Sequence, residues 1–309
     1  MNSEPNAIPG PAVESPGPAD IPATQRLYWA VRREVWENRS IYLAPLAVAA
    51  VILFGFLISM IRLPAKVRAA AALGPVEEHH LLAQPYLFAA GVMMLTTLVV
   101  GVFYSLDALY GERRDRSILF WKSLPVSDVT AVLSKASIPL VVLPLLTFAI
   151  AVASHIWMML LSSAVLVSNG LSPATPSQLP LGQSGLTLLY GLATMALWHA
   201  PIYAWLLVVS AWAKRAAILW AFLPPMALAV FEKMAFRTSY LGSFLRYRFV
   251  GWMGEAFAFS GPKGHVQIES LTQLTPGRFL SSAGFWLGLI FAALFLVAAV
   301  RLRRDRAPL

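Results

Sequence analysis

The stretch YLAPLAVAAVILFGFLISMI, residues 42–61, contains no charged side chain. A helix rises about 1.5 Å per residue, so about 20 apolar residues are enough to cross the roughly 30 Å hydrocarbon core of a bilayer. The stretch therefore predicts a helix that spans a membrane.

Similar runs without Asp, Glu, Lys or Arg recur at residues 86–106, 136–161, 186–211 and 279–300. A sixth candidate, residues 216–231, is shorter and contains adjacent prolines, which favour a kink or a break. The whole chain is 58% hydrophobic and 13% charged, whereas about a quarter of the residues in a typical soluble domain are charged. The sequence thus predicts an all-α polytopic membrane protein with six transmembrane helices, formed by residues 42–300.

The distribution of basic residues supports six spans rather than five. Most of the 24 Lys and Arg residues lie in segments 24–41, 107–135, 212–215 and 301–309, which six spans place on one side of the membrane. Lys and Arg are enriched in cytoplasmic loops, so this side is expected to be the cytoplasm and to contain both termini. Without the fifth span, the Arg-rich segment 301–309 would lie outside.

The two ends of the chain have different compositions. Residues 1–23 are rich in Pro, Gly, Ala and Ser and predict a disordered cytoplasmic tail, whereas residues 301–309 form a basic cytoplasmic tail. Residues 24–41 carry apolar residues at helical spacing opposite charged ones, which predicts an amphipathic interfacial helix; an ordinary charged flank of the first span is the alternative. The net charge of +9 is attributed to contacts with membrane lipids rather than with nucleic acid.

The loop LYGERRDRSILFWKSLPVSDVTAVLSK, residues 109–135, combines charge with an apolar cluster. Its highly charged beginning is followed by Ile118, Leu119, Phe120 and Trp121. Such a cluster needs a surface to bury it, and both a partner protein and the membrane interface would serve. The pair Ser127-Asp128 predicts the N-terminal cap of the next helix.

Several motifs resemble those of ABC-2 type transporter permeases. In the loop they are Gly111-Glu112-Arg113, Ser117, Leu124-Pro125-Val126-Ser127 and Lys135. The opening RREVWENRSIYLAPL, residues 32–46, is similar to the connecting helix and first-span entry of that family. The resemblance implies a cytoplasmic coupling helix that contacts the ATPase, formed by Glu112, Arg113, Arg114, Ser117, Ile118, Leu119, Phe120, Trp121, Leu124 and Pro125.

The same resemblance implies partners for this chain. Two permease subunits, here expected as a homodimer or as a pair with a similar permease, assemble with two copies of an ABC ATPase in a bacterial-type inner (plasma) membrane. A nucleotide-binding P-loop needs a Gly-Lys dipeptide, and the sequence contains none. The chain is therefore expected to be no enzyme and to bind no cofactor itself, with ATP and Mg on the partner ATPase.

Two histidines within the spans and one Glu-Glu-His-His segment could bind a substrate or a metal. His155 and His199 lie within predicted spans and are candidate pathway residues, with a hydrogen bond across helices as the alternative. Residues 77–80, Glu-Glu-His-His, could donate metal ligands, but solvated loops also contain such residues, and no metal site is predicted. Residues 233–278 predict interfacial or re-entrant helices. The alternative to the membrane subunit of an ATP-driven exporter is a secondary transporter driven by an ion gradient. Such a transporter would require paired acids or broken helices within the spans.

Overall fold

The computed structural model describes residues 22–72, 74–116, 127–173, 181–258 and 271–305. The all-α prediction is confirmed, because the described residues form helices and a single isolated bridge between Phe257 and Leu274. The elements in chain order are α1 (Ala23–Glu37), α2 (Ser40–Ser59), η1 (Met60–Arg62), α3 (Leu63–Ala71), α4 (Pro75–Asp107), α5 (Tyr110–Arg114), α7 (Asp128–Ser137), η2 (Ile138–Val142), α8 (Leu143–Ser168), α9 (Leu181–Trp212), α10 (Ala217–Phe236), α11 (Tyr240–Ala256), η3 (Leu271–Gln273), α12 (Pro276–Ser281) and α13 (Ala283–Asp305).

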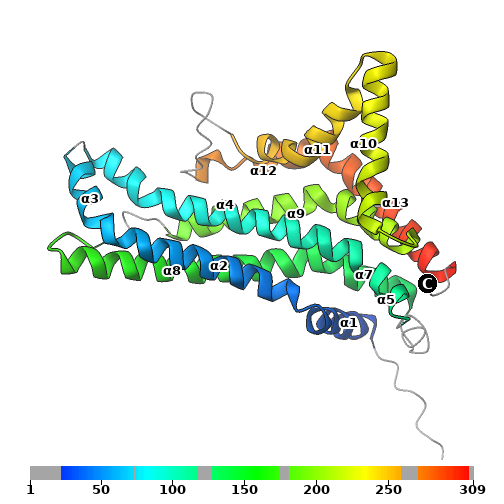
Figure 1. Cartoon of the computed structure of the whole chain (residues 1–309), viewed down its shortest axis with the longest axis horizontal. Coiled ribbons are helices and arrows are strands. Elements are labelled where there is room, and N and C mark those ends of the chain that lie inside the picture. Colours follow the sequence, from blue (N-terminus) through cyan, green and yellow to red (C-terminus); the bar gives the residue numbers. More distant parts are fainter. Residues whose placement is uncertain (1–21, 73, 117–126, 174–180, 259–270, 306–309) are drawn as a thin grey trace, which may run out of the picture.

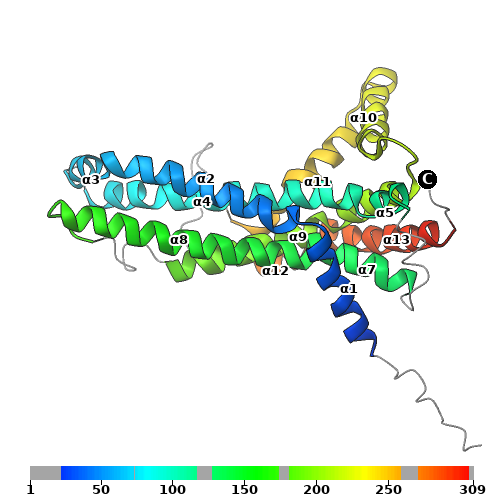
Figure 2. The same cartoon turned by 60° about the horizontal axis from the view of Figure 1, so that its bottom comes forward.

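Six of the helical segments in the described residues are long and apolar enough to cross a membrane. The helices α2, α4, α8 and α9 lie side by side in a long bundle (Figures 1 and 2). Among the six segments α9 is the most buried, and α13 packs along it. The chain is therefore a multi-pass helical bundle built around α9.

Local sequence signals set several helix ends. The Ser127 hydroxyl accepts a hydrogen bond from the Thr130 amide at 3.1 Å, so the predicted cap of α7 is confirmed. Gly74, with φ of 129°, precedes Pro75 at the first position of α4. Gly170, with φ of 71°, follows the end of α8, and its amide bonds to the Val167 carbonyl.

The helix α10 projects sideways from the bundle and is the least buried of the six (Figures 1 and 2). Pro224 and Pro225 lie inside this helix, which is continuous, so the prolines do not break the sixth predicted span. Pro225 cannot donate a hydrogen bond to the carbonyl of Ala221, but the indole N–H of Trp205 from α9 donates to that oxygen at 3.3 Å. A neighbouring side chain thus replaces one of the two missing backbone bonds.

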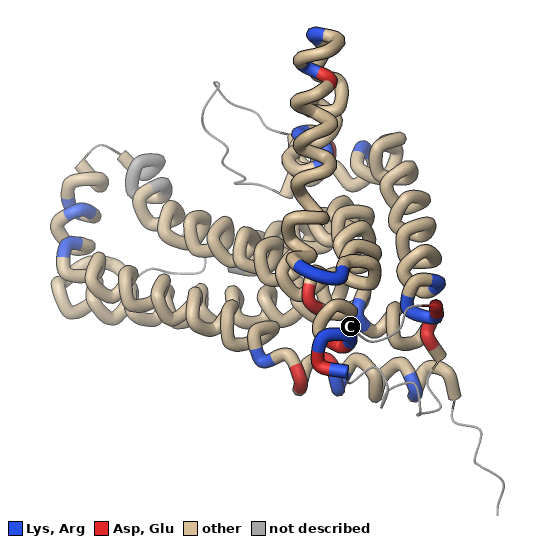
Figure 3. The backbone as a smooth tube through the Cα atoms, turned by 45° about the vertical axis from the view of Figure 1, so that its right-hand side comes forward, with Lys and Arg blue, Asp and Glu red and all other residues tan. Residues whose placement is uncertain are grey.

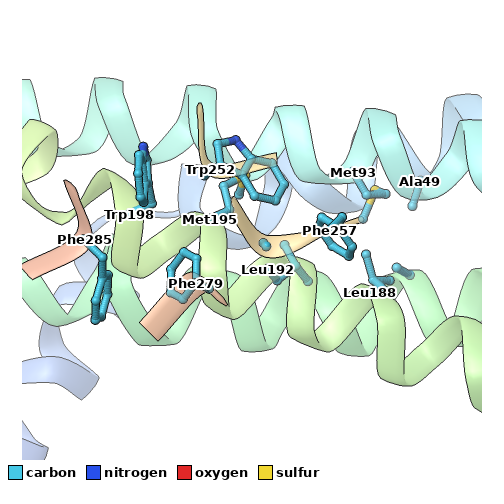
Figure 4. Close-up of a cluster of buried hydrophobic side chains, with 12 residues drawn as sticks. Ala49, Met93, Leu188, Leu192, Met195, Trp198, Trp252, Phe257, Phe279 and Phe285 are labelled. Atoms are coloured by element: carbon cyan, nitrogen blue, oxygen red, sulfur yellow. The ribbon is translucent and has the colours of Figure 1, made fainter. Parts of the chain in front are cut away.

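The helices α11 and α12 return to the bundle and pack on α9. The largest hydrophobic cluster joins Trp198 of α9 with Trp252, Phe257 and Phe279 from this returning segment (Figure 4). The predicted span over residues 279–300 is interrupted at Ser282, which has extended backbone and whose hydroxyl accepts a bond from the Phe285 amide. The last apolar helix, α13, consequently begins at Ala283.

Candidate functional site

One end of the bundle carries a buried group of charged side chains, here called the ion-pair cluster. Its members are Arg33 and Glu34 from α1, Glu112 from α5, Asp128 and Lys135 from α7, and Arg303 from α13. Figure 3 shows acidic and basic positions gathered near the C-terminal end of the chain. The three basic and three acidic members balance in formal charge, and Glu37, whose side chain is 45% exposed, adds a further carboxylate 3.5 Å from Arg33.

Lys135 is the central cation of the cluster. Its Nζ lies 2.9 Å from Glu34 Oε1 and 3.0 Å from Glu112 Oε1. The Lys135 side chain is 3% exposed and that of Glu34 is fully buried. One ammonium group therefore connects α1, α5 and α7 away from solvent.

Arg303 connects the last helix to the same cluster. Its Nη2 lies 3.4 Å from Glu112 Oε2, and its Nη1 forms an ion pair with Asp128. The helices α1 and α13 are thus linked through Glu112, which also lies 3.6 Å from Arg33 Nη2. Removing one partner of such a buried pair is costly, because the remaining charge has no compensation.

The electrostatic environment keeps Glu34 ionised. Burial by itself would raise the pKa of the Glu34 carboxyl, but the Lys135 ammonium, the Tyr104 hydroxyl and Arg33 together hold that pKa below its ordinary value. The Tyr104 hydroxyl donates to Glu34 Oε2 at 2.8 Å. The cluster thereby extends from α1 to α4.

Of the proposed coupling residues, Glu112 and Arg113 point into the protein. The Glu112 side chain is 9% exposed and belongs to the cluster. Arg113 donates from Nη1 to the carbonyls of Ala211 at 2.6 Å and Ala213 at 3.2 Å, where α9 ends. Arg114, in contrast, is half exposed and pairs with Asp115 and Asp107. Arg114 is therefore the described member that remains available to a partner.

The other proposed coupling residues lie outside the described part of the chain. They are Ser117, Ile118, Leu119, Phe120, Trp121, Leu124 and Pro125. The described residues show what flanks them: Glu112 and Arg113 precede the segment, and Asp128 and Lys135 follow it. Charged side chains that are held by ion pairs or hydrogen bonds thus flank residues 117–126 on both sides.

The two candidate pathway histidines have different neighbours. The ring of His155 lies 5.5 Å from that of Tyr86, whereas His199 Nδ1 and Nε2 lie 2.7 Å and 3.2 Å from the carbonyl oxygens of Met195 and Phe249. His199 is fully buried and joins α9 to α11, as the hydrogen-bonding alternative expects. The described residues contain no group of three or more metal-ligating side chains.

A buried arginine holds the returning segment in place. Arg248 of α11 donates to the carbonyls of Trp198 and, at 3.0 Å, Gly284, and its guanidinium lies 4.7 Å from the centre of the Trp198 ring. The Trp198 indole donates in turn to the Arg248 carbonyl at 2.9 Å. Arg248 therefore links α9, α11 and α13.

The sequence analysis missed Glu34, Asp128 and Arg303 as members of one site. A signal for Glu34 was present in the sequence, because it lies three residues after the apolar Val31 and therefore on the same side of the helix. Its partner Lys135 is 101 residues away, and no local spacing links the two positions.

No match was found among protein-family models, curated proteins or solved structures. The function is therefore inferred from the geometry of the chain itself.

Proposed function

We propose that this chain is the membrane subunit of an ATP-driven exporter of the ABC-2 type. The observation that carries the proposal is the ion-pair cluster on both sides of residues 117–126. A force applied to this segment by a partner would reach α7 directly, and α1 and α13 through Lys135, Glu112 and Arg303. The arrangement suits a loop that transmits movement to several spans at once.

The energy source is proposed to lie on another polypeptide. The sequence has no Gly-Lys dipeptide for a P-loop, so two ABC ATPase subunits would bind ATP and Mg and dock against residues 117–126. This chain would form the substrate pathway and catalyse no bond change. The membrane is proposed to be a bacterial-type inner membrane, with the ion-pair cluster on the cytoplasmic side.

A second copy of the chain is proposed to complete the permease. The helix α10 buries only Ala217 and Ala221, close to its start, and exposes large apolar side chains such as Leu223, Met226 and Phe231. A second permease subunit packed against α10 would cover this surface and give the twofold assembly expected of such a transporter.

The test is reconstitution of this chain with each ABC ATPase of the same organism. Purified together, the two proteins should form a complex of two permease and two ATPase subunits, and this chain alone should not hydrolyse ATP. An ATPase variant that lacks its P-loop lysine is the control, because it should assemble without supporting transport. Transport by this chain on an ion gradient, without any ATPase, would establish the secondary-transporter alternative instead.

A further inference from the structure

Two adjoining cavities lie between α2 and α4, at the end of the bundle opposite the ion-pair cluster. Their volumes are about 540 Å³ and 640 Å³, within the range of roughly 300–1,000 Å³ typical of ligand pockets. Both are lined by Phe56, Ser59, Pro85 and Phe88, so they form one continuous feature, here called the α2–α4 groove.

One half of the groove is polar and basic. Lys66 of α3 lines it together with Gln84, Tyr86 and Ser162. No acidic side chain is found paired with Lys66 among the described residues. The Tyr86 side chain is 6% exposed, and its hydroxyl has no hydrogen-bond partner in the described part of the chain. The Lys66 ammonium is therefore the charged group of the groove, and the Tyr86 hydroxyl lies beneath its surface.

The other half of the groove is apolar. It is lined by Val48, Val51, Ile52, Gly55 and Val92, besides the shared residues. Val51 and Phe88 line it and are also exposed on the outer surface of their helices. The groove is consequently open toward the surroundings of the bundle, where a membrane protein meets lipid tails.

We infer that the α2–α4 groove binds a phospholipid with a net negative headgroup. One acyl chain occupies the apolar half, and the phosphate pairs with the Lys66 ammonium at the other end. Charge favours this occupant over a neutral one, because Lys66 lines the groove and no acidic residue is among its lining residues. The inference does not rest on the proposed exporter function, since the groove and the ion-pair cluster lie at opposite ends of the bundle.

The test measures how well the purified full-length chain retains lipid in detergent, by native mass spectrometry. Phosphatidylglycerol should be retained more strongly than phosphatidylcholine with the same acyl chains. Lys66→Gln should weaken phosphatidylglycerol retention about fivefold, the change that corresponds to about 1 kcal/mol per basic residue at 1.4 kcal/mol per tenfold. Arg62→Gln is the matched control, because Arg62 is exposed nearby and does not line the groove.

A second pair of variants tests the acyl-chain half. A Cβ at Gly55 or at Gly91 would meet nothing within 4 Å, but only Gly55 lines the groove. Gly55→Leu should therefore fill the apolar half and reduce phosphatidylglycerol retention, whereas Gly91→Leu should not. Equal retention of the two lipids by the wild-type chain would overturn the inference, as would equal effects of the two leucine variants. Displacement of the lipid by glycerol phosphate without acyl chains would identify a simple anion site instead.

Discussion

Lys135 Nζ lies 2.9 Å from Glu34 Oε1, and the two side chains are almost completely shielded from solvent. The contact joins the helix before the first span to the beginning of the third span. A pair buried in this way contributes little net stability compared with apolar packing, yet losing one partner is costly. The pair therefore acts mainly by fixing the position of α1 relative to α7.

Replacing Lys135 alone should destabilise the protein more than replacing both members of the pair. Lys135→Met leaves Glu34 and Glu112 buried without their shared cation, and we expect a loss of about 3–5 kcal/mol. Adding Glu34→Gln should recover part of that loss. Thermal unfolding in detergent measures both effects, and Lys214→Met, at an exposed position, is the control. Strictly additive losses in the double variant would contradict the coupling.

Stability should fall in acid through Glu34. Its pKa in the folded protein lies below the ordinary value of 4.5, so the folded state binds fewer protons than the unfolded state in this range. The contribution of Glu34 is complete above about pH 4.5 and is lost as the pH falls through the lower folded pKa. Melting temperatures measured from pH 7 downward should show this decline. The Glu34→Gln variant should show a shallower decline in the same range.

The apolar cluster of the loop should bind the ATPase. If Phe120 or Trp121 docks in a groove of the partner, truncation to alanine removes about 2 kcal/mol or more, and affinity falls about 30-fold. Subunit affinity should be measured in detergent, where membrane anchoring of the loop plays no part. Unchanged affinity for both variants would favour the alternative in which these aromatics insert into lipid.

Reversal of Glu112 should act by a different route. Glu112→Arg places a new cation beside Lys135 and Arg303, so it should loosen the cluster itself. Arg114→Glu is the matched comparison, because Arg114 is exposed and its loss leaves the cluster intact. We expect only Glu112→Arg to lower the melting temperature of the chain without its partner.

The orientation of the chain can be tested with single cysteines, since the sequence has none. Cysteines at positions 117 and 307 should react only from the cytoplasmic side, and those at positions 172 and 260 only from outside. Impermeant maleimide labelling of intact cells and of inverted vesicles gives the comparison. External labelling at position 307 would contradict the six-span arrangement.

A methyl group at Gly288 should loosen the returning segment. A Cβ there would collide with the guanidinium of Arg248, which is held by two carbonyls. Gly288→Ala should therefore be destabilising by about 1–3 kcal/mol although alanine favours helices. Gly254→Ala in α11 is the control, because its Cβ would meet nothing within 4 Å. Equal melting temperatures for the two variants would show that Arg248 moves aside freely.

The sequence predicted those features that depend on neighbouring residues. Runs of apolar residues gave the spans, and Ser127 gave the cap of α7. The break at Ser282 was missed because residues 279–300 contain no charged residue, although serine before Ala-Gly-Phe is a recognisable cap signal. The coupling-helix assignment for residues 117–126 stays a prediction.

The pairings that build the candidate site could not be predicted in the same way. Arg303 was counted only as part of a basic tail, and Arg248 belongs to residues 233–278, for which only interfacial or re-entrant helices were predicted. Each acquires its role from residues far away in the chain, such as Gly284 and Glu112. Charge balance within a buried cluster is a property of three-dimensional packing and leaves no periodic trace along the sequence.

The ion-pair cluster also imposes an order on biosynthesis. Glu34 can meet Lys135 as soon as the third span begins to emerge, but Glu112 and Arg303 are 191 residues apart. At about 5–20 residues per second, translation needs roughly 10–40 s to cover that distance. During this interval the first helices of the nascent chain pack together without Arg303 of α13. The early helices must therefore tolerate an incomplete set of charges until Arg303 has been synthesised.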